Sequence, residues 1–340
     1  MDQWNILLVT ERGKAVWTLA LLSPIVAELM SGSSPPLEFF NPFSFVGLLG
    51  MYGAGALLVR EFTVSWGKGW ATIIILGAAY GIIEEGLAVK SFFDPGWEDL
   101  EDLNIYGRFW STNWVWAVWL TIFHSTISIS VPILMTGMLY PQFRGTRLLT
   151  ERQFRLVLVL FVVDIGVFAL LFLFNYVPPA AQYLLAMGVV ALLFCWAKRV
   201  PANLVSARHV DPSWKPWKFY FLGLLMLAGN FFIASSPLMR GFHPLGTIAV
   251  LLATSTFVIV MLQHKLGRMN NLPHKASFIG GMLTLWVLFG VLLESAGVVG
   301  MSLVAVAAAL LIVDLNRFAR GKQTFVFFKK NVKRAYVIGG

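Results

Sequence analysis

The chain has 340 residues, of which 58% are hydrophobic and 13% are charged, about half the charged fraction of an ordinary soluble domain. A water-soluble fold of this size could not cover so much apolar surface, so the composition excludes a soluble globular protein. The net charge of +9 would be compatible with a nucleic-acid partner. However, Lys and Arg lie in short loops between apolar blocks, as they do in membrane proteins. We therefore expect a lipid bilayer as the partner and no nucleic acid.

Ten apolar blocks follow one another along the chain, each near the roughly 20 residues that a helix needs to cross about 30 Å of hydrocarbon. Because backbone amides in lipid must be satisfied within the segment, the blocks predict helices. They cover residues 15–30, 43–59, 70–89, 113–140, 156–176, 180–197, 217–237, 244–263, 277–293 and 297–313. We predict an all-α, polytopic transmembrane bundle of about ten helices, which forms a single domain over residues 1–316 in the plasma membrane.

The positive charges predict the topology of this bundle. Of the 26 Lys and Arg residues, all but Lys90, Arg108 and Arg240 fall in alternate segments between the blocks or in the terminal segments. Positive residues collect on the cytoplasmic side, so both termini are predicted to be cytoplasmic. Residues 317–340 form a basic cytoplasmic tail with several phenylalanines, a composition that suits an anionic inner leaflet, although a plain positive-inside anchor is the simpler interpretation.

Residues 91–112 form the longest predicted outer loop. The loop mixes carboxylates with six aromatic residues. Aromatic side chains favour the membrane interface, so the loop is predicted to lie on the bilayer surface. There it would cover any site that lies between the helices below it.

Two adjacent carboxylates, Glu84 and Glu85, lie in the third predicted helix. A charge at the centre of a membrane helix costs about 2.5–3.5 kcal/mol on insertion scales, so the pair requires an explanation. Gly77 and Gly81 share a broad face with them, and small residues let another backbone approach. The two acids are therefore predicted to point into the bundle.

The fourth predicted helix carries a matching polar stripe at helical spacing. Its members are Thr121, His124, Ser125 and Ser128. The two helices are antiparallel neighbours, so His124 can meet Glu84 and Glu85 within the membrane. We predict these three residues as the catalytic group. The alternative is that they only form hydrogen bonds between helices and fix their packing.

Further polar residues are candidates for binding around this group. The predicted set is Glu28, Asn113, Thr121, Ser125 and Ser128. Glu28 lies near the outer end of the first helix, where it borders the same cavity or simply marks the interface. Asn113, Ser125 and Thr121 are candidate oxyanion partners.

The pair and the histidine resemble the motifs of the CAAX-protease and bacteriocin-processing superfamily of intramembrane peptidases. That pattern is two glutamates, three residues and Arg or Lys, then Phe, three residues and His. Lys90 falls one residue late, and Leu120 replaces the Phe four residues before His124. For the later His or Asn of the pattern, Asn175 and Asn230 are the candidates. The resemblance covers residues 80–125 and implies a glutamate-dependent intramembrane peptidase.

Three functions are compatible with this site. In a hydrolase, one carboxylate takes a proton from water and His124 orients that water, or Glu84, Glu85 and His124 together hold a divalent metal. In a proton- or cation-coupled transporter, the glutamates bind a proton or substrate ion, and glycine-rich stretches such as residues 47–55 permit mobile helices. In a non-catalytic membrane subunit, the cluster binds a partner helix. The sequence leaves open whether the substrate is a peptide or a small solute, and whether a metal is present.

Overall fold

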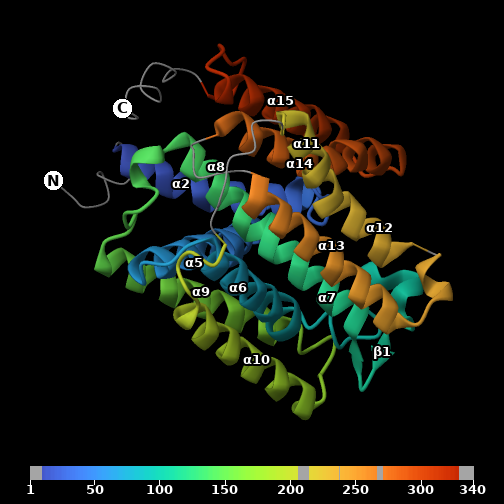
Figure 1. Ribbon diagram of the computed structural model, residues 1–340. Coiled ribbons are helices and arrows are strands. Elements are labelled where there is room, and N and C mark those ends of the chain that lie inside the picture. Colours follow the sequence, from blue (N-terminus) through green and yellow to red (C-terminus); the bar gives the residue numbers. More distant parts are fainter. Residues whose placement is uncertain (1–9, 206–213, 237, 266–270, 329–340) are drawn as a thin grey trace. The chain divides into compact units, whose positions relative to one another are not determined.

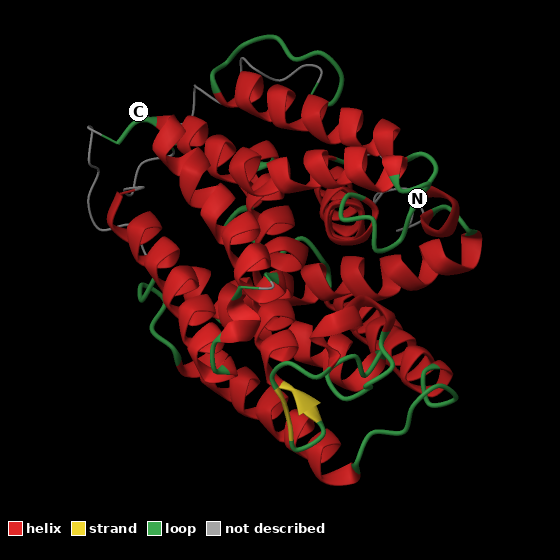
Figure 2. Ribbon diagram, turned by 90° about the vertical axis from the view of Figure 1, so that its right-hand side faces the viewer, coloured by secondary structure: helices red, strands yellow, loops and turns green. Residues whose placement is uncertain are grey.

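The structure is a computed structural model that describes residues 10–205, 214–236, 238–265 and 271–328. Helices dominate the described part of the chain (Figure 2). A short antiparallel pair, β1 (Arg108–Phe109) and β2 (Thr112–Asn113), lies in the predicted outer loop. The predicted all-α class is confirmed.

Within the described ranges, nine helices are long and apolar enough to cross a membrane. They are Pro42–Ser65, Trp70–Ala88, Trp114–Leu139, Glu151–Leu171, Ala180–Arg199, Pro216–Ser235, Pro244–Lys265, Leu272–Ser295 and Met301–Ala319. The predicted first span is also helical, as α2 (Glu11–Pro24) and a π-helical turn, η1 (Ile25–Leu29), but it is not among these nine, and it carries Glu11, Arg12, Lys14 and Glu28.

Several helices end at residues other than those that hydropathy indicated. The second predicted helix continues from residue 59 to Ser65, because Arg60 and Glu61 form an ion pair inside it at 2.5 Å. The predicted 156–176 span instead runs over Glu151–Leu171, since a capping box at Thr150 and Gln153 starts the helix earlier. The last helix covers Met301–Ala319 rather than 297–313. Hydropathy identifies the part of a helix that lies in hydrocarbon, whereas caps and ion pairs decide where the helix ends.

Packing divides the chain into two compact units. The first comprises residues 1–24, 42–205 and 231–253, and the second comprises residues 25–41, 206–230 and 254–340. In the first unit α6 (Trp70–Gly81) packs against α5 (Ala54–Ser65), α7 (Trp114–Phe123) and α10 (Ala180–Arg199) (Figure 1). In the second unit α14 (Leu272–Ser295) packs between α11 (Pro216–Leu224) and α15 (Met301–Ala319).

Loops that the charges assign to the cytoplasm come together at one end of the first unit. Arg60 donates to the carbonyls of Phe143 and Thr146, the latter at 2.8 Å. Lys68 Nζ donates to the carbonyl of Val200 at 2.8 Å. The segments near residues 60, 145 and 200 therefore share one end of this unit, as the predicted topology requires.

The predicted outer segments gather in the same way. Gln182 Nε2 donates to the carbonyl of Trp110 at 3.0 Å, and the Tyr106 hydroxyl donates to the carbonyl of Met239 at 2.6 Å. The outer loop thus contacts both other outer segments of the first unit. Which of the two ends faces the cytoplasm stays a prediction.

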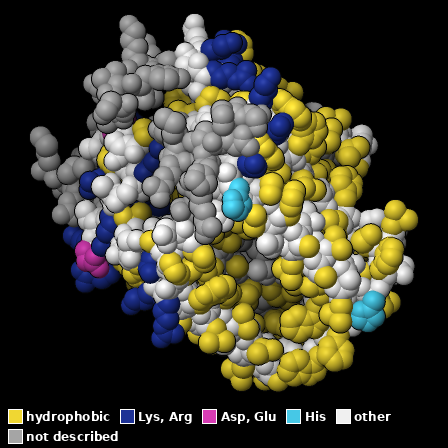
Figure 3. Space-filling view, viewed as in Figure 1, with side chains coloured by type: hydrophobic (Ala, Val, Ile, Leu, Met, Phe, Trp, Pro, Cys, Tyr) yellow, Lys and Arg dark blue, Asp and Glu magenta, His cyan; other side chains and the backbone are white. Residues whose placement is uncertain are grey.

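Some helix faces expose apolar side chains, and these faces mark the lipid-facing surface. On α9 (Glu151–Leu171), Val159, Val162 and Leu170 are 57%, 60% and 63% exposed. Hydrophobic side chains also cover much of the face seen in Figure 3. Such exposure would be costly in water and is expected in hydrocarbon.

Candidate functional site

The candidate site lies where two neighbouring α-helices widen into π-helical turns. The helix α6 continues into η3 (Ile82–Ala88), which carries Glu84 and Glu85. The helix α7 continues into η5 (His124–Ser130), which begins at His124. Single π-helical segments inside α-helices are rare and frequently occur at functional sites.

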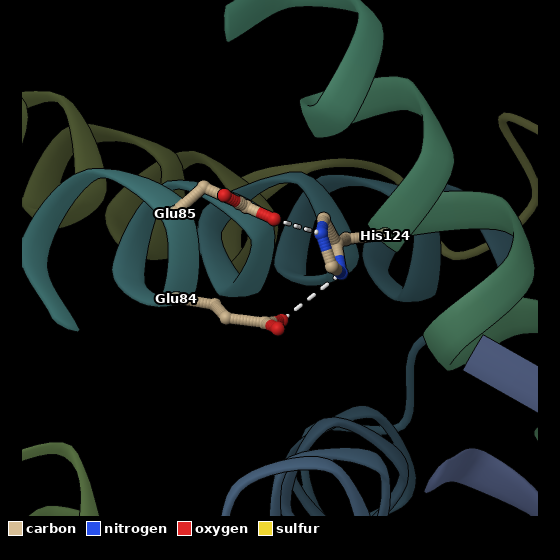
Figure 4. A group of neighbouring side chains, drawn as sticks. All are labelled: Glu84, Glu85 and His124. Atoms are coloured by element: carbon tan, nitrogen blue, oxygen red, sulfur yellow. Dashed lines mark hydrogen bonds and ion pairs between the residues drawn. The ribbon is translucent and has the colours of Figure 1, made fainter. Parts of the chain in front are cut away.

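His124 bridges the two carboxylates with its two ring nitrogens (Figure 4). Its Nε2 lies 2.9 Å from Glu85 Oε1, and its Nδ1 lies 3.0 Å from Glu84 Oε2. His124 is 1% exposed and Glu84 is 3% exposed, while the Glu85 side chain is 12% exposed. The predicted meeting of the three residues in the bundle interior is therefore confirmed.

The remaining carboxylate oxygens are held by hydroxyl groups. The Tyr52 hydroxyl donates to Glu84 Oε1, and Ser91 Oγ donates to Glu85 Oε2. Ser91 in turn accepts a hydrogen bond from Trp116 Nε1 at 3.1 Å. Each glutamate therefore has its own hydroxyl donor, and the two donors come from different segments of the chain.

Ser128, a residue of the predicted binding set, forms a hydrogen bond with the histidine. Its Oγ lies 3.0 Å from His124 Nδ1, one helical turn further along η5. The same nitrogen faces Glu84 Oε2, which makes no hydrogen bond with any residue that the structure describes. We therefore interpret the approach of Nδ1 to Glu84 as an ion-pair contact, with Ser128 as the hydrogen-bond partner.

Glycines on α6 allow this close approach of the two helices. A Cβ atom added at Gly77 would lie 2.9 Å from Ser125 Cα, and one at Gly81 would lie 3.0 Å from His124 Cβ. Real Cβ atoms essentially never come as close as the first distance, and the second is tighter than nine in ten real Cβ contacts. The small-residue face predicted from the sequence is the surface on which the histidine helix packs.

Three other predicted binding residues have structural partners. Asn113 caps α7, because its Oδ1 accepts from the Trp116 N–H at 3.0 Å while its Nδ2 donates to the carbonyl of Leu103 at 2.8 Å. Ser125 Oγ donates to the carbonyl of Ile74 at 2.8 Å. Glu28 lies in the second unit and accepts from Ser34 Oγ at 2.8 Å. Thr121 lies beside Gly81, where its Cα is 3.3 Å from an added Cβ.

The other polar residues of the motif comparison have partners or positions of their own. Lys90 Nζ donates to the carbonyls of Ala88 and Ala169, at 3.3 and 2.5 Å, and so binds the ends of two helices. Asn175 is exposed in the turn that follows α9. Asn230 belongs to the second unit, where its Nδ2 donates to Ser255 Oγ at 3.1 Å.

Sequence reasoning missed Tyr52 and Ser91, which bind the glutamates directly. Tyr52 lies in another π-helical turn, η2 (Leu49–Gly53), within the glycine-rich stretch noted above. A phenol inside an apolar, glycine-rich helix is the signal that could have identified it. Ser91 follows the glutamates by six residues, and only the turn at Lys90, with a φ of 68°, brings it back to Glu85.

The triad has donor atoms suited to a divalent metal. One ligand atom from each of Glu84, Glu85 and His124 can be chosen so that all three lie within 4.8 Å of one another. Carboxylate and imidazole groups are common ligands of catalytic zinc, which keeps one further position for water. The Glu84 oxygen that lacks a hydrogen-bond partner among the described residues fits this use.

Comparison with known proteins gives a family match. Residues 18–331 match a family described as an uncharacterized membrane protein family. No curated protein and no solved structure matches the chain.

Proposed function

The chain belongs to this uncharacterized membrane protein family, and we propose that it is an intramembrane hydrolase, with a peptide bond as its substrate and Glu84, Glu85 and His124 as its reacting groups. The observation that carries the proposal is the bridging imidazole, 2.9 and 3.0 Å from two carboxylates in a buried site. The resemblance of residues 80–125 to the CAAX-protease and bacteriocin-processing superfamily points to the same chemistry.

A purely structural role accounts less well for this set of residues. Well-packed apolar side chains often replace a buried ion pair without loss of stability, so packing alone does not require three ionisable groups in hydrocarbon. Two carboxylates and an imidazole at contact distance are instead what proton transfer requires, since a general base must reach its proton within about 3 Å.

In the proposed reaction, Glu85 is the base because its carboxylate is the more exposed of the two. It takes a proton from a water molecule, whose oxygen forms a bond to the substrate carbonyl carbon. The carbon–nitrogen bond then breaks, and the proton passes to the departing amine, which leaves a carboxylic acid and an amine as products. His124 orients the water and shares the proton, while Glu84 stabilises the imidazolium.

A metal ion is compatible with this scheme. Glu84, Glu85 and His124 would hold it, and it would supply a water molecule that loses its proton more readily. Tyr52 and Ser91 would then orient the two carboxylates as ligands, since hydrogen bonds to ligands fix their geometry.

The test reconstitutes the purified protein in proteoliposomes and measures both cleavage of membrane-embedded peptides and solute flux driven by a pH gradient. We expect cleavage in the wild type and its loss in Glu85→Gln. In His124→Ala we expect turnover to fall about 10²-fold or more, with peptide binding retained. Chelator treatment then decides whether a metal takes part.

Asp164→Asn is the matched control, because Asp164 is another intramembrane carboxylate of the first unit and its Oδ2 has no hydrogen-bond partner among the described residues. Its cleavage activity should equal that of the wild type. Gradient-driven flux without any cleavage would refute the peptidase and favour the transporter. Full activity of Glu85→Gln would exclude a catalytic role for that carboxylate.

A further inference from the structure

A buried carboxylate near the end of the last helix binds the chain that follows it. Asp314 in α15 is fully buried, and its two oxygens accept the backbone N–H groups of Phe325, Val326 and Phe327 at 2.7, 2.7 and 2.9 Å. Gly321, with a φ of +67°, reverses the chain just after the helix. Residues 321–328 therefore fold back along the final turns of α15.

A second set of contacts holds the same segment. Arg317 Nε donates to the carbonyl of Gln323 at 2.5 Å, and the guanidinium carbon lies 4.2 Å from the centre of the Phe325 ring. The rings of Phe318 and Phe328 pack at 5.6 Å. The segment is thus packed against α15.

The backbone contacts and the side-chain exposure of this segment point to an apolar environment. Three consecutive N–H groups bind one buried carboxylate, although in water they would need no protein partner. Backbone groups at the edge of hydrocarbon do need such a partner. The side chains of the same residues face outward: Phe325, Val326 and Phe327 are 55%, 53% and 45% exposed. The segment thus presents apolar side chains while its backbone N–H groups are hydrogen-bonded.

Cations accompany these apolar side chains. Arg320 and Lys322 are exposed in the turn that leads into the segment. No Asp or Glu occurs in the sequence after Asp314, and four more Lys or Arg residues follow Phe328. The sequence that follows Asp314 therefore carries only positive charges, and Arg320 and Lys322 bring two of them next to the outward-facing aromatic and aliphatic cluster.

We propose that residues 320–328 form a docking surface for anionic phospholipid, which we call the tail anchor. Phe325, Val326 and Phe327 enter the edge of the hydrocarbon, while Arg320 and Lys322 meet the lipid phosphates. Each basic residue near an anionic surface contributes about fivefold to lipid preference. Asp314 holds the backbone of the tail anchor against α15 and so keeps these side chains facing outward. The tail anchor is independent of the triad and of the proposed hydrolysis.

The test places an environment-sensitive fluorophore on Val326→Cys in full-length protein, with the natural Cys195 replaced by Ser. Protein is reconstituted in nanodiscs of phosphatidylcholine with increasing phosphatidylglycerol, and quenching by aqueous acrylamide is measured. We expect the fluorophore to become shielded as phosphatidylglycerol increases. Arg320→Gln with Lys322→Gln should raise the phosphatidylglycerol fraction at half-maximal shielding severalfold, and high salt should act in the same direction.

The control fluorophore is placed on Val299→Cys, in the turn before α15, where quenching should not depend on the lipid. Asp314→Asn should expose the Val326 fluorophore in every lipid, because the amide N–H₂ group opposes the backbone N–H groups. If that variant does not fold, the Arg320 and Lys322 substitutions decide alone. Equal shielding in neutral and anionic lipid, or no effect of those two substitutions, would overturn the proposal.

Discussion

Glu84 and Glu85 follow one another in the chain, yet the two carboxylates have different surroundings. Glu84 is almost fully buried and accepts from the Tyr52 phenol, whereas the Glu85 side chain is 12% exposed and accepts from Ser91. His124 contacts both. The two carboxylates therefore differ in exposure and in hydroxyl donor, and on this difference the proposal assigns the base to Glu85.

Tyr52→Phe should lower stability by about 1–3 kcal/mol, because it leaves a buried carboxylate oxygen of Glu84 without its donor. The ring and its packing are kept. Thermal unfolding in detergent measures the loss. Tyr220→Phe is the control, since it removes only a neutral contact between the hydroxyls of Tyr220 and Thr284 and should cost about 1 kcal/mol or less. Equal losses in the two variants would contradict a special contribution of the Tyr52–Glu84 hydrogen bond.

At the scale of the elements, the π-helical turns decide how the triad meets. In an α-helix, adjacent side chains diverge by about 100°, so Glu84 and Glu85 would point well apart. The wider turn of η3 reduces that divergence, and both carboxylates reach one imidazole. The turns η2 and η5 place Tyr52, His124 and Ser128 in the same site.

The close contact of α6 with η5 predicts a strong effect of a single methyl group. Gly77→Ala places a Cβ 2.9 Å from the Cα of Ser125, which is backbone and cannot rotate away, so we expect a loss of about 1–3 kcal/mol. Gly188→Ala in α10 meets no atom within 4 Å and should be neutral or stabilise the helix. Unfolding by a denaturing detergent compares the two variants. Equal stability of both would mean that the helices are less closely packed than described.

At the scale of the whole molecule, the arrangement of loops follows the charge pattern. Positive segments meet at one end of the first unit, where Glu61 accepts from Arg60 at 2.5 Å and from Arg147 at 3.3 Å. The outer loop and its neighbours meet at the other. The nine apolar helices found among the described residues would by themselves place the termini on opposite sides, so the predicted cytoplasmic placement of both requires that the first helix, from Glu11 to Leu29, also spans the membrane.

Cysteine labelling tests this topology in intact cells. In a Cys195→Ser background, an impermeant reagent should modify Asp99→Cys, which is exposed in the outer loop, but not Lys68→Cys at the other end. Permeabilised cells give the control in which Lys68→Cys is labelled. Labelling of Lys68→Cys alone in intact cells would invert the predicted orientation.

The sequence by itself determined the membrane class, the positions of most helices and the meeting of Glu84, Glu85 and His124. The hydrophobicity of a segment and the positive charges that flank it are properties of that segment alone, so the sequence is enough to determine them. Only the tertiary structure showed the π-helical turns, the Tyr52 and Ser91 donors and the return of the chain to Asp314. These features depend on which side chains of distant segments come into contact, and the energy of such contacts arises only when the helices pack.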